Sequence, residues 1–124
     1  MRNQPKYHLF KNTSYALAGL KDILQNESSF KIEILLALVL IPFILYIDAS
    51  IVEKSLLFIT LMGVLIAETI NSSIERVVDL VTLEHHEMAK RAKDVGSTVV
   101  FLSITLFVII WSALLYNIYL WDAH

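Results

Sequence analysis

The chain has 124 residues, of which 56% are hydrophobic and 18% are charged, whereas soluble domains average about 45–50% and about 25%. This balance favours one membrane-embedded domain over residues 1–124 rather than a soluble or multidomain protein. The absence of cysteine excludes disulfides and thiolate chemistry, and the formal net charge of −2 gives no reason to expect nucleic acid as a partner.

The first predicted element is an amphipathic helix over residues 10–26, which follows a loose tail at residues 1–9. At about 100° per residue, its apolar side chains fall on one arc and its lysines on another. Asn12 or Thr13 is the expected N-terminal cap. A basic amphipathic helix is typical of the membrane surface, and the alternative is an ordinary helix packed on its neighbours. No cleavable signal peptide is expected, because the first 31 residues are mixed and polar.

Three membrane-spanning helices are predicted after the surface helix, at residues 30–48, 52–81 and 95–121. The first contains an uncharged run that only Pro42 interrupts, and the third carries no charge from Val95 to Trp121. The second is about 45 Å long at ~1.5 Å per residue. One of its ends must therefore extend beyond the hydrocarbon core, which is ~30 Å thick.

The lysine and arginine residues predict how these spans are oriented. They occur at Arg2, Lys6, Lys11, Lys21 and Lys31 before the first span, and at Arg76, Lys90, Arg91 and Lys93 between the second and the third. The turn between the first and second spans has only Lys54. By the positive-inside rule, the amino terminus and residues 76–94 are expected in the cytoplasm and the carboxyl terminus outside.

A stripe of polar side chains follows one face of the second predicted span. On a helical wheel, the narrow arc contains Glu68, Asn71, Ser72, Glu75 and Asp79. A charge near the bilayer centre costs about 2.5–3.5 kcal/mol, so such residues usually face a protein interior or an aqueous cavity. Solvation beyond the end of the membrane is the alternative, above all for Asp79.

Carboxylates and an amide on one helix face fit three kinds of chemistry. They can bind a hard cation such as Mg²⁺, which commonly takes one or two carboxylates together with substrate phosphates. A carboxylate at the membrane boundary can also take a proton from a lipid hydroxyl. A proton relay or an ion path is the third possibility. The residues alone leave all three open.

A charged segment at residues 82–94, with the run LEHHEMAKRAKD, connects the second and third spans and is expected in the cytoplasm. Adjacent His85 and His86 would point about 100° apart on a helix and form no HExxH motif, so a solvated helical face is favoured over a metal site. Lys93 fits either a contact to phosphates or a positively charged anchor. The sequence has no glycine-rich phosphate-binding loop.

The runs AETINSSIERVVD and HEMAKRAKDVGS resemble the prokaryotic diacylglycerol kinase family, and YALAGLKDILQNESSF resembles that family's surface helix. The resemblance extends from about residue 8 to about residue 120. It implies an all-α membrane protein, a homotrimeric bundle with three transmembrane helices and a surface helix in each chain, in the bacterial inner membrane. It also implies an enzyme that transfers the γ-phosphoryl group of MgATP to diacylglycerol, which yields phosphatidic acid at the cytoplasmic interface.

The same resemblance assigns roles to individual residues. Glu68 matches the catalytic base at the lipid's primary hydroxyl, and Glu27 and Glu75 match the carboxylates that hold Mg²⁺. With Glu68, the expected contacts to the lipid substrate are Asn71 and Ser97, and Asp79 is expected to line the same site. The expected nucleotide contacts are Tyr15, Glu27, Glu75, Glu84, His85, His86, Lys93 and Asp94.

Some features leave alternatives open. Relatives carry arginine near the position of His8, and histidine is a weaker cation at neutral pH, so no role is assigned to His8. Undecaprenol kinase is the alternative within the same class, although KDVGS is more similar to the diacylglycerol branch than KDxAA would be. From another class, a small proton-coupled transporter or channel subunit would need polar side chains through the full depth of the membrane, whereas those of this chain collect at one side.

Overall fold

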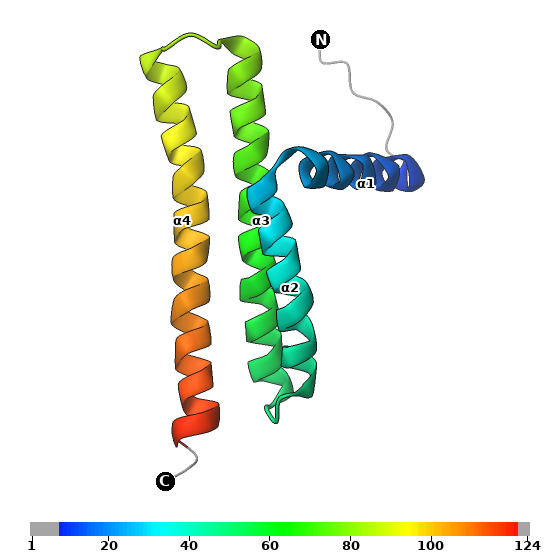
Figure 1. Cartoon of the computed structure of the whole chain (residues 1–124), viewed down its shortest axis with the longest axis vertical. Helices are drawn as coiled ribbons and strands as arrows, with labels where there is room; N and C mark the ends of the chain where they lie inside the picture. The colour runs from blue at the N-terminus through cyan, green and yellow to red at the C-terminus, as the bar shows by residue number, and fades with distance from the viewer. Residues whose placement is uncertain (1–7, 122–124) are drawn as a thin grey trace.

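The chain is folded into α-helices joined by short links (Figure 1), as described over residues 8–121 by a computed structural model. The helices are α1 (Leu9–Asn26), α2 (Ser28–Tyr46), α3 (Ile51–Val81) and α4 (Glu87–Tyr116), and the π-helical segment η1 (Asn117–Trp121) follows. The predicted all-helical class is confirmed. The tail predicted at residues 1–9, with Arg2 and Lys6, lies mostly outside the described residues.

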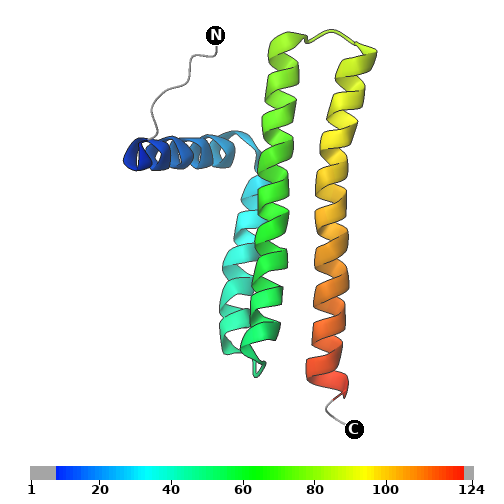
Figure 2. The same cartoon turned by 180° about the vertical axis from the view of Figure 1, so that it is seen from behind.

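The helices form a bundle that one short helix crosses. Helices α2, α3 and α4 run side by side along the long axis, and α1 lies across that direction near the start of α2 (Figures 1 and 2). Among residues 8–121, only α3 and α4 continue beyond the level of α1, and they are joined there by their link. This is the geometry expected of a helix in the membrane surface attached to helices that cross the bilayer.

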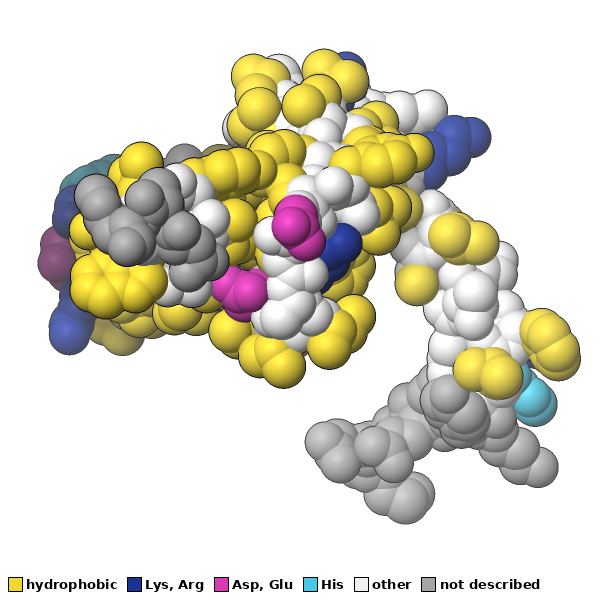
Figure 3. Space-filling model, turned by 90° about the horizontal axis from the view of Figure 1, so that it is seen from below, with side chains coloured by type: hydrophobic (Ala, Val, Ile, Leu, Met, Phe, Trp, Pro, Cys, Tyr) yellow, Lys and Arg dark blue, Asp and Glu magenta, His cyan; other side chains and the backbone are white. Residues whose placement is uncertain are grey.

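Two helices in the described part of the chain are long and apolar enough to cross a membrane, Ser28–Tyr46 and Glu87–Trp121. Many large apolar side chains of the bundle point outward, among them Leu38, Phe101 and Ile109. Figure 3 shows this apolar surface from the end that carries the α2–α3 turn. Such a surface suits lipid or other protein better than water. A third span in α3 and a homotrimer stay predictions.

The first helix begins earlier than its capping signal suggested. The cap predicted at Asn12 or Thr13 is wrong, because α1 starts at Leu9 with His8 in the capping position. The hydroxyl of Thr13 instead donates to the carbonyl of Leu9 at 2.8 Å. A threonine that bonds back to the preceding turn is compatible with a helix interior, so its presence did not mark a helix start.

The α2–α3 turn is fixed by local hydrogen bonds. Pro42 lies inside α2 without ending it, and the turn follows Tyr46. Ser50 and Glu53 form a capping box, in which the Glu53 N–H donates to Ser50 Oγ at 3.1 Å and the Ser50 N–H donates to Glu53 Oε1 at 3.0 Å. Lys54 Nζ also donates to the carbonyl of Leu45 at 3.0 Å.

The last long helix begins at Glu87 rather than at Val95. Residues 87–94 of the predicted cytoplasmic segment are therefore the first turns of α4. His86 caps this helix, since its Nδ1 accepts a hydrogen bond from the Met88 N–H at 3.1 Å. The link between α3 and α4 is thus short, and it places the charged start of α4 beside the end of α3.

The core lies where α2, α3 and α4 meet, and Trp111 connects all three helices. Its indole N–H donates to the carbonyl of Leu57 at 3.2 Å and to Thr60 Oγ1 at 3.1 Å, both on α3. The indole ring stacks on Phe43 of α2 and packs on Phe107 of its own helix, with ring centroids 6.4 and 4.9 Å away. Leu57 is fully buried beneath it.

We expect Trp111→Phe to destabilise the bundle, because it removes the N–H and leaves part of the buried indole volume empty. Hydrogen bonds between membrane helices average about 0.6 kcal/mol, and a cavity adds about 24 cal/mol per Å³, so the free energy of unfolding should decrease by more than about 0.6 kcal/mol. Unfolding in detergent measures the change. Trp121→Phe, at an exposed ring, is the control. An unchanged stability would show that the indole N–H contributes nothing.

Candidate active site

Acidic side chains of α3 meet the α1–α2 corner around a small polar cavity. Glu68, Asn71 and Glu75 from α3 and Glu27 from the corner line this space of about 120 Å³, together with Ser29, Phe30 and Ser72. We call it the acidic cavity. The wheel prediction that Glu68, Asn71, Ser72 and Glu75 share one face is confirmed, and residues far apart in the sequence complete the site.

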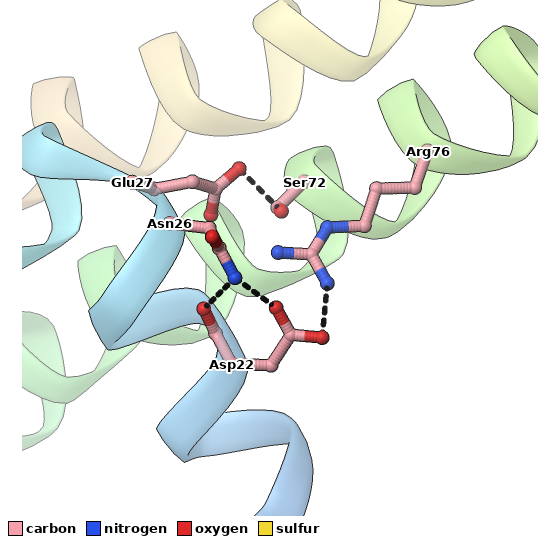
Figure 4. Close-up of polar contacts among 5 residues, drawn as sticks. All are labelled: Asp22, Asn26, Glu27, Ser72 and Arg76. Carbon is pink, nitrogen blue, oxygen red and sulfur yellow. Dashed lines mark hydrogen bonds and ion pairs between the residues drawn. The ribbon is translucent and has the colours of Figure 1, made fainter.

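Glu27 is placed by the corner between α1 and α2. It is the single extended residue between the two helices, and its N–H donates to the carbonyl of Ile23 at 3.0 Å. Its carboxylate makes no capping hydrogen bond. It reaches α3 instead, where the Ser72 hydroxyl donates to Glu27 Oε1 at 2.6 Å (Figure 4). One extended residue thus brings a third carboxylate to the face that carries Glu68 and Glu75.

Asn71 is held between Glu75 and α4. Its Nδ2 donates to Glu75 Oε1 at 3.1 Å, while its Oδ1 is buried without a hydrogen-bond partner among the described residues. A Cβ atom at Gly96 would lie 2.5 Å from this Oδ1. The absence of a side chain at Gly96 therefore allows α4 to approach α3 and leaves room for the amide.

The donors of the acidic cavity fit a magnesium ion. Within residues 8–121, no group of three or more histidine, aspartate or glutamate side chains is arranged to hold a metal by itself. Mg²⁺ does not need one, because it usually takes one or two carboxylates and completes its shell with water and substrate phosphates. Glu27 and Glu75 supply two such carboxylates.

A further carboxyl group, Glu33 on α2, lies beside Glu68. The two side chains face each other, and within residues 8–121 no hydrogen-bond donor reaches the buried Oε2 of Glu33. Sequence reasoning missed this contact, because it joins two different helices.

A second hollow, of about 380 Å³, lies at the α3–α4 link. We call it the link pocket. The structure brings together here the predicted nucleotide contacts Glu84, His85, His86, Lys93 and Asp94. Asp79 also lines this pocket rather than the acidic cavity. The polar stripe of α3 therefore contributes side chains to both spaces. Tyr15 and Ser97 line neither space and are exposed.

The cations of the link pocket are paired with acids. Lys93 Nζ lies 2.7 Å from Asp79 Oδ1, and Lys90 Nζ lies 2.8 Å from Asp94 Oδ2. The side chains of both pairs are about half exposed, and such ion pairs contribute little stability. A phosphate can therefore compete for these lysines at small cost. His86 can contact a ligand only through Nε2 while its Nδ1 caps α4.

These features define an all-helical protein with membrane-length apolar helices and an acidic site where α1 meets the bundle. The family model for prokaryotic diacylglycerol kinase matches residues 14–115. A diacylglycerol kinase of Haemophilus influenzae is 38% identical over 109 residues, which cover 88% of this chain and 92% of the relative. The diacylglycerol kinase of Pseudomonas aeruginosa is 39% identical over 103 residues, which cover 83% of this chain and 84% of the relative. The diacylglycerol kinase of Escherichia coli K12 is 36% identical over 109 residues, which cover 88% of this chain and 89% of the relative.

The chain belongs to the prokaryotic diacylglycerol kinase family. The resemblance read from the sequence is confirmed.

Proposed function

We propose that the protein is a magnesium-dependent diacylglycerol kinase. It transfers the γ-phosphoryl group of ATP to the primary hydroxyl of diacylglycerol, so that the products are phosphatidic acid, ADP and the proton lost from the hydroxyl. The diacylglycerol kinases among its relatives, which match along most of both chains, support this kinase activity and lipid substrate.

One observation carries the proposal, namely that a carboxylate cavity and an apolar pocket adjoin along α3. Glu33 lines an apolar pocket of about 280 Å³ with Leu36, Leu40, Leu61, Val64, Leu65, Ile104, Phe107 and Val108. The same Glu33 faces Glu68 of the acidic cavity. A lipid whose apolar part occupies this pocket has its hydroxyl beside Glu68. Phosphoryl transfer depends mainly on positioning and charge neutralisation, which this arrangement supplies.

Each residue has a proposed role. Glu68 takes the proton from the acceptor hydroxyl, and Asn71 and Ser97 orient the lipid headgroup. Glu27 and Glu75 hold magnesium, which when bound neutralises charge on the ATP phosphates. The nucleotide occupies the link pocket against Glu84, His85, His86, Lys93 and Asp94, with Tyr15 on the nucleotide side.

The site belongs at the cytoplasmic face of the bacterial inner membrane. Nine of the ten basic residues lie in the amino-terminal part or in residues 76–94, and such an excess is typical of cytoplasmic segments. The carboxyl terminus then lies outside. The outward-facing apolar side chains suit a homotrimer of three-span protomers in lipid, and neighbouring protomers would enclose the acidic cavity further.

The deciding experiment offers two acceptors at once. Purified protein in lipid bicelles receives ATP labelled at the γ-phosphate, with diacylglycerol and undecaprenol present together. We expect the label in phosphatidic acid, and only when Mg²⁺ is added. Label in undecaprenyl phosphate would assign the protein to the other lipid kinase. Label in neither lipid would overturn the kinase proposal and favour a transporter.

We expect Gly96→Ala to lower turnover by up to about 10²-fold, the effect of displacing a catalytic group by about 1 Å. The new methyl group would push the Asn71 amide away from Glu75, because the space between α3 and α4 is already filled. Turnover at saturating substrates measures the effect, and Gly63→Ala, where a Cβ meets nothing within 4 Å, is the control. Equal activity of the two variants would remove Asn71 from the mechanism.

A further inference from the structure

A polar network joins the end of α1 to α3 next to the acidic cavity (Figure 4). Asp22 Oδ2 lies 3.2 Å from a guanidinium nitrogen of Arg76. Asp22 Oδ1 accepts a hydrogen bond from Asn26 Nδ2 at 2.6 Å, and the same amide donates to the carbonyl of Asp22 at 3.0 Å. The contact of Ser72 with Glu27 lies beside this network.

We propose that Asp22, Asn26 and Arg76 form a positioning clamp that holds the Glu27 carboxylate opposite Glu75 and thereby sets the affinity of the acidic cavity for a divalent cation. This proposal rests on the metal role proposed above for Glu27 and Glu75. The clamp residues touch neither cation nor substrate, and they act through the orientation of α1.

The corner needs such a clamp because apolar packing holds α1 weakly. Of all the residues of α1, Ile23 alone is buried. The position of the Glu27 side chain depends on how α1 meets α2, since Glu27 is the only residue between them. A contact from the last turns of α1 to α3 therefore helps to set where this carboxylate lies. The Asp22–Arg76 pair is such a contact, and it acts beside the Ser72–Glu27 hydrogen bond.

The sequence places the α3 end of the clamp next to the second carboxylate. Arg76 directly follows Glu75 and comes one helical turn after Ser72. Neighbouring residues on a helix point about 100° apart, so Glu75 faces the acidic cavity while Arg76 reaches α1. Arg76 also lines the groove between α1 and α3. The same turn of α3 thus carries the proposed ligand Glu75 and, through Arg76, holds the end of α1 next to the other proposed ligand, Glu27.

The expected effect is moderate. The two charged side chains are 45% and 50% exposed, and an exposed ion pair shifts an equilibrium by up to about five-fold. Breaking the pair should therefore weaken cation binding about three- to five-fold. It should leave the fold and the rate at saturating cation nearly unchanged.

The first measurement is cation affinity without turnover. Full-length protein in bicelles, with a non-hydrolysable ATP analogue bound, is titrated with Mn²⁺, and free Mn²⁺ is followed by its paramagnetic resonance. We expect Arg76→Gln and Asp22→Asn to raise the Kd about three- to five-fold. Lys21→Gln, which removes a charge beside Asp22, should have no effect. The exchanged pair Asp22→Arg with Arg76→Asp should recover most of the affinity. Unchanged Kd values in both single variants would overturn the proposal.

A second measurement tests the clamp independently of kinase activity. Because the chain has no cysteine, spin labels can be placed at Ser14→Cys on α1 and Leu80→Cys on α3, both exposed positions, in samples diluted with unlabelled protein. We expect Arg76→Gln to broaden the distance distribution and the exchanged pair to narrow it again. An unchanged distribution in Arg76→Gln would show that the pair does not hold α1 and would overturn the clamp.

The Mg²⁺ dependence of turnover separates a positioning role from general destabilisation. We expect the Mg²⁺ concentration for half-maximal rate to rise about three- to five-fold in Arg76→Gln, with kcat at saturating Mg²⁺ within about two-fold of the parent. A fall in kcat alone would contradict the proposal. If the parent protein phosphorylated no lipid, the proposed function would fail, while the Mn²⁺ and distance measurements would still decide the clamp.

Discussion

Replacing Glu68 by glutamine is expected to lower turnover by about 10²–10⁴-fold, which is the usual contribution of a general base. Glutamine keeps the size of the side chain and loses the ability to accept a proton. Glu68 lines the acidic cavity beside Asn71 and Glu75, and it faces Glu33. In the proposed mechanism, this carboxylate acts on a hydroxyl that enters from the apolar pocket lined by Glu33.

The same variant should still fold and bind MgATP, because the proposed nucleotide contacts lie in the link pocket. Turnover with diacylglycerol and binding of an ATP analogue are measured side by side. Asp48→Asn is the matched control, since it removes an exposed carboxylate from the turn at the other end of α3. Near-normal turnover of Glu68→Gln would remove Glu68 from its role. Loss of nucleotide binding would point to a structural defect.

Replacing Glu75 by glutamine is expected to weaken Mg²⁺-dependent nucleotide binding by about 10-fold or more. Changes to the residues that merely support metal ligands already cost about 10–100-fold in metal affinity. Glutamine can still accept the hydrogen bond from Asn71 Nδ2, so the local packing should persist. The substitution removes the negative charge of Glu75, which is one of the two carboxylates proposed to hold the cation.

The test compares nucleotide affinity with Mg²⁺ present and after its removal by a chelator. In the parent protein, removal should weaken binding strongly. In Glu75→Gln, the affinity with Mg²⁺ should fall toward the chelated value, while the chelated value itself should change little. Equal Mg²⁺ dependence in the two proteins would argue against a metal role for Glu75. Glu27→Gln should behave similarly, because Glu27 lines the same cavity.

Helical periodicity predicted much of this architecture. The apolar arc of α1, the long apolar runs of α2 and α4, and the shared face of Glu68, Asn71 and Glu75 follow from residues close together in the sequence. These patterns show which side chains of one helix lie on its apolar face and which lie on its polar face. They identified the elements and one wall of the acidic cavity.

Contacts between helices could not be predicted in the same way. The pairs Ser72–Glu27, Arg76–Asp22 and Glu68–Glu33 depend on the angle and register at which two helices meet. The spacing of apolar residues along one helix does not determine that angle or register. The start of α4 was missed for a local reason. Histidine is not among the preferred capping residues, so His86 gave no signal of the helix that follows it.

The single-residue joint at Glu27 restricts insertions and deletions as well as substitutions. One added extended residue would lengthen this joint by about 3.3 Å and change the direction in which α2 leaves α1. The buried face of α2, with Phe30, Ala37 and Ile44, would then turn away from α3, or α1 would lose its place against α3. The length of the chain at this corner is therefore fixed by geometry.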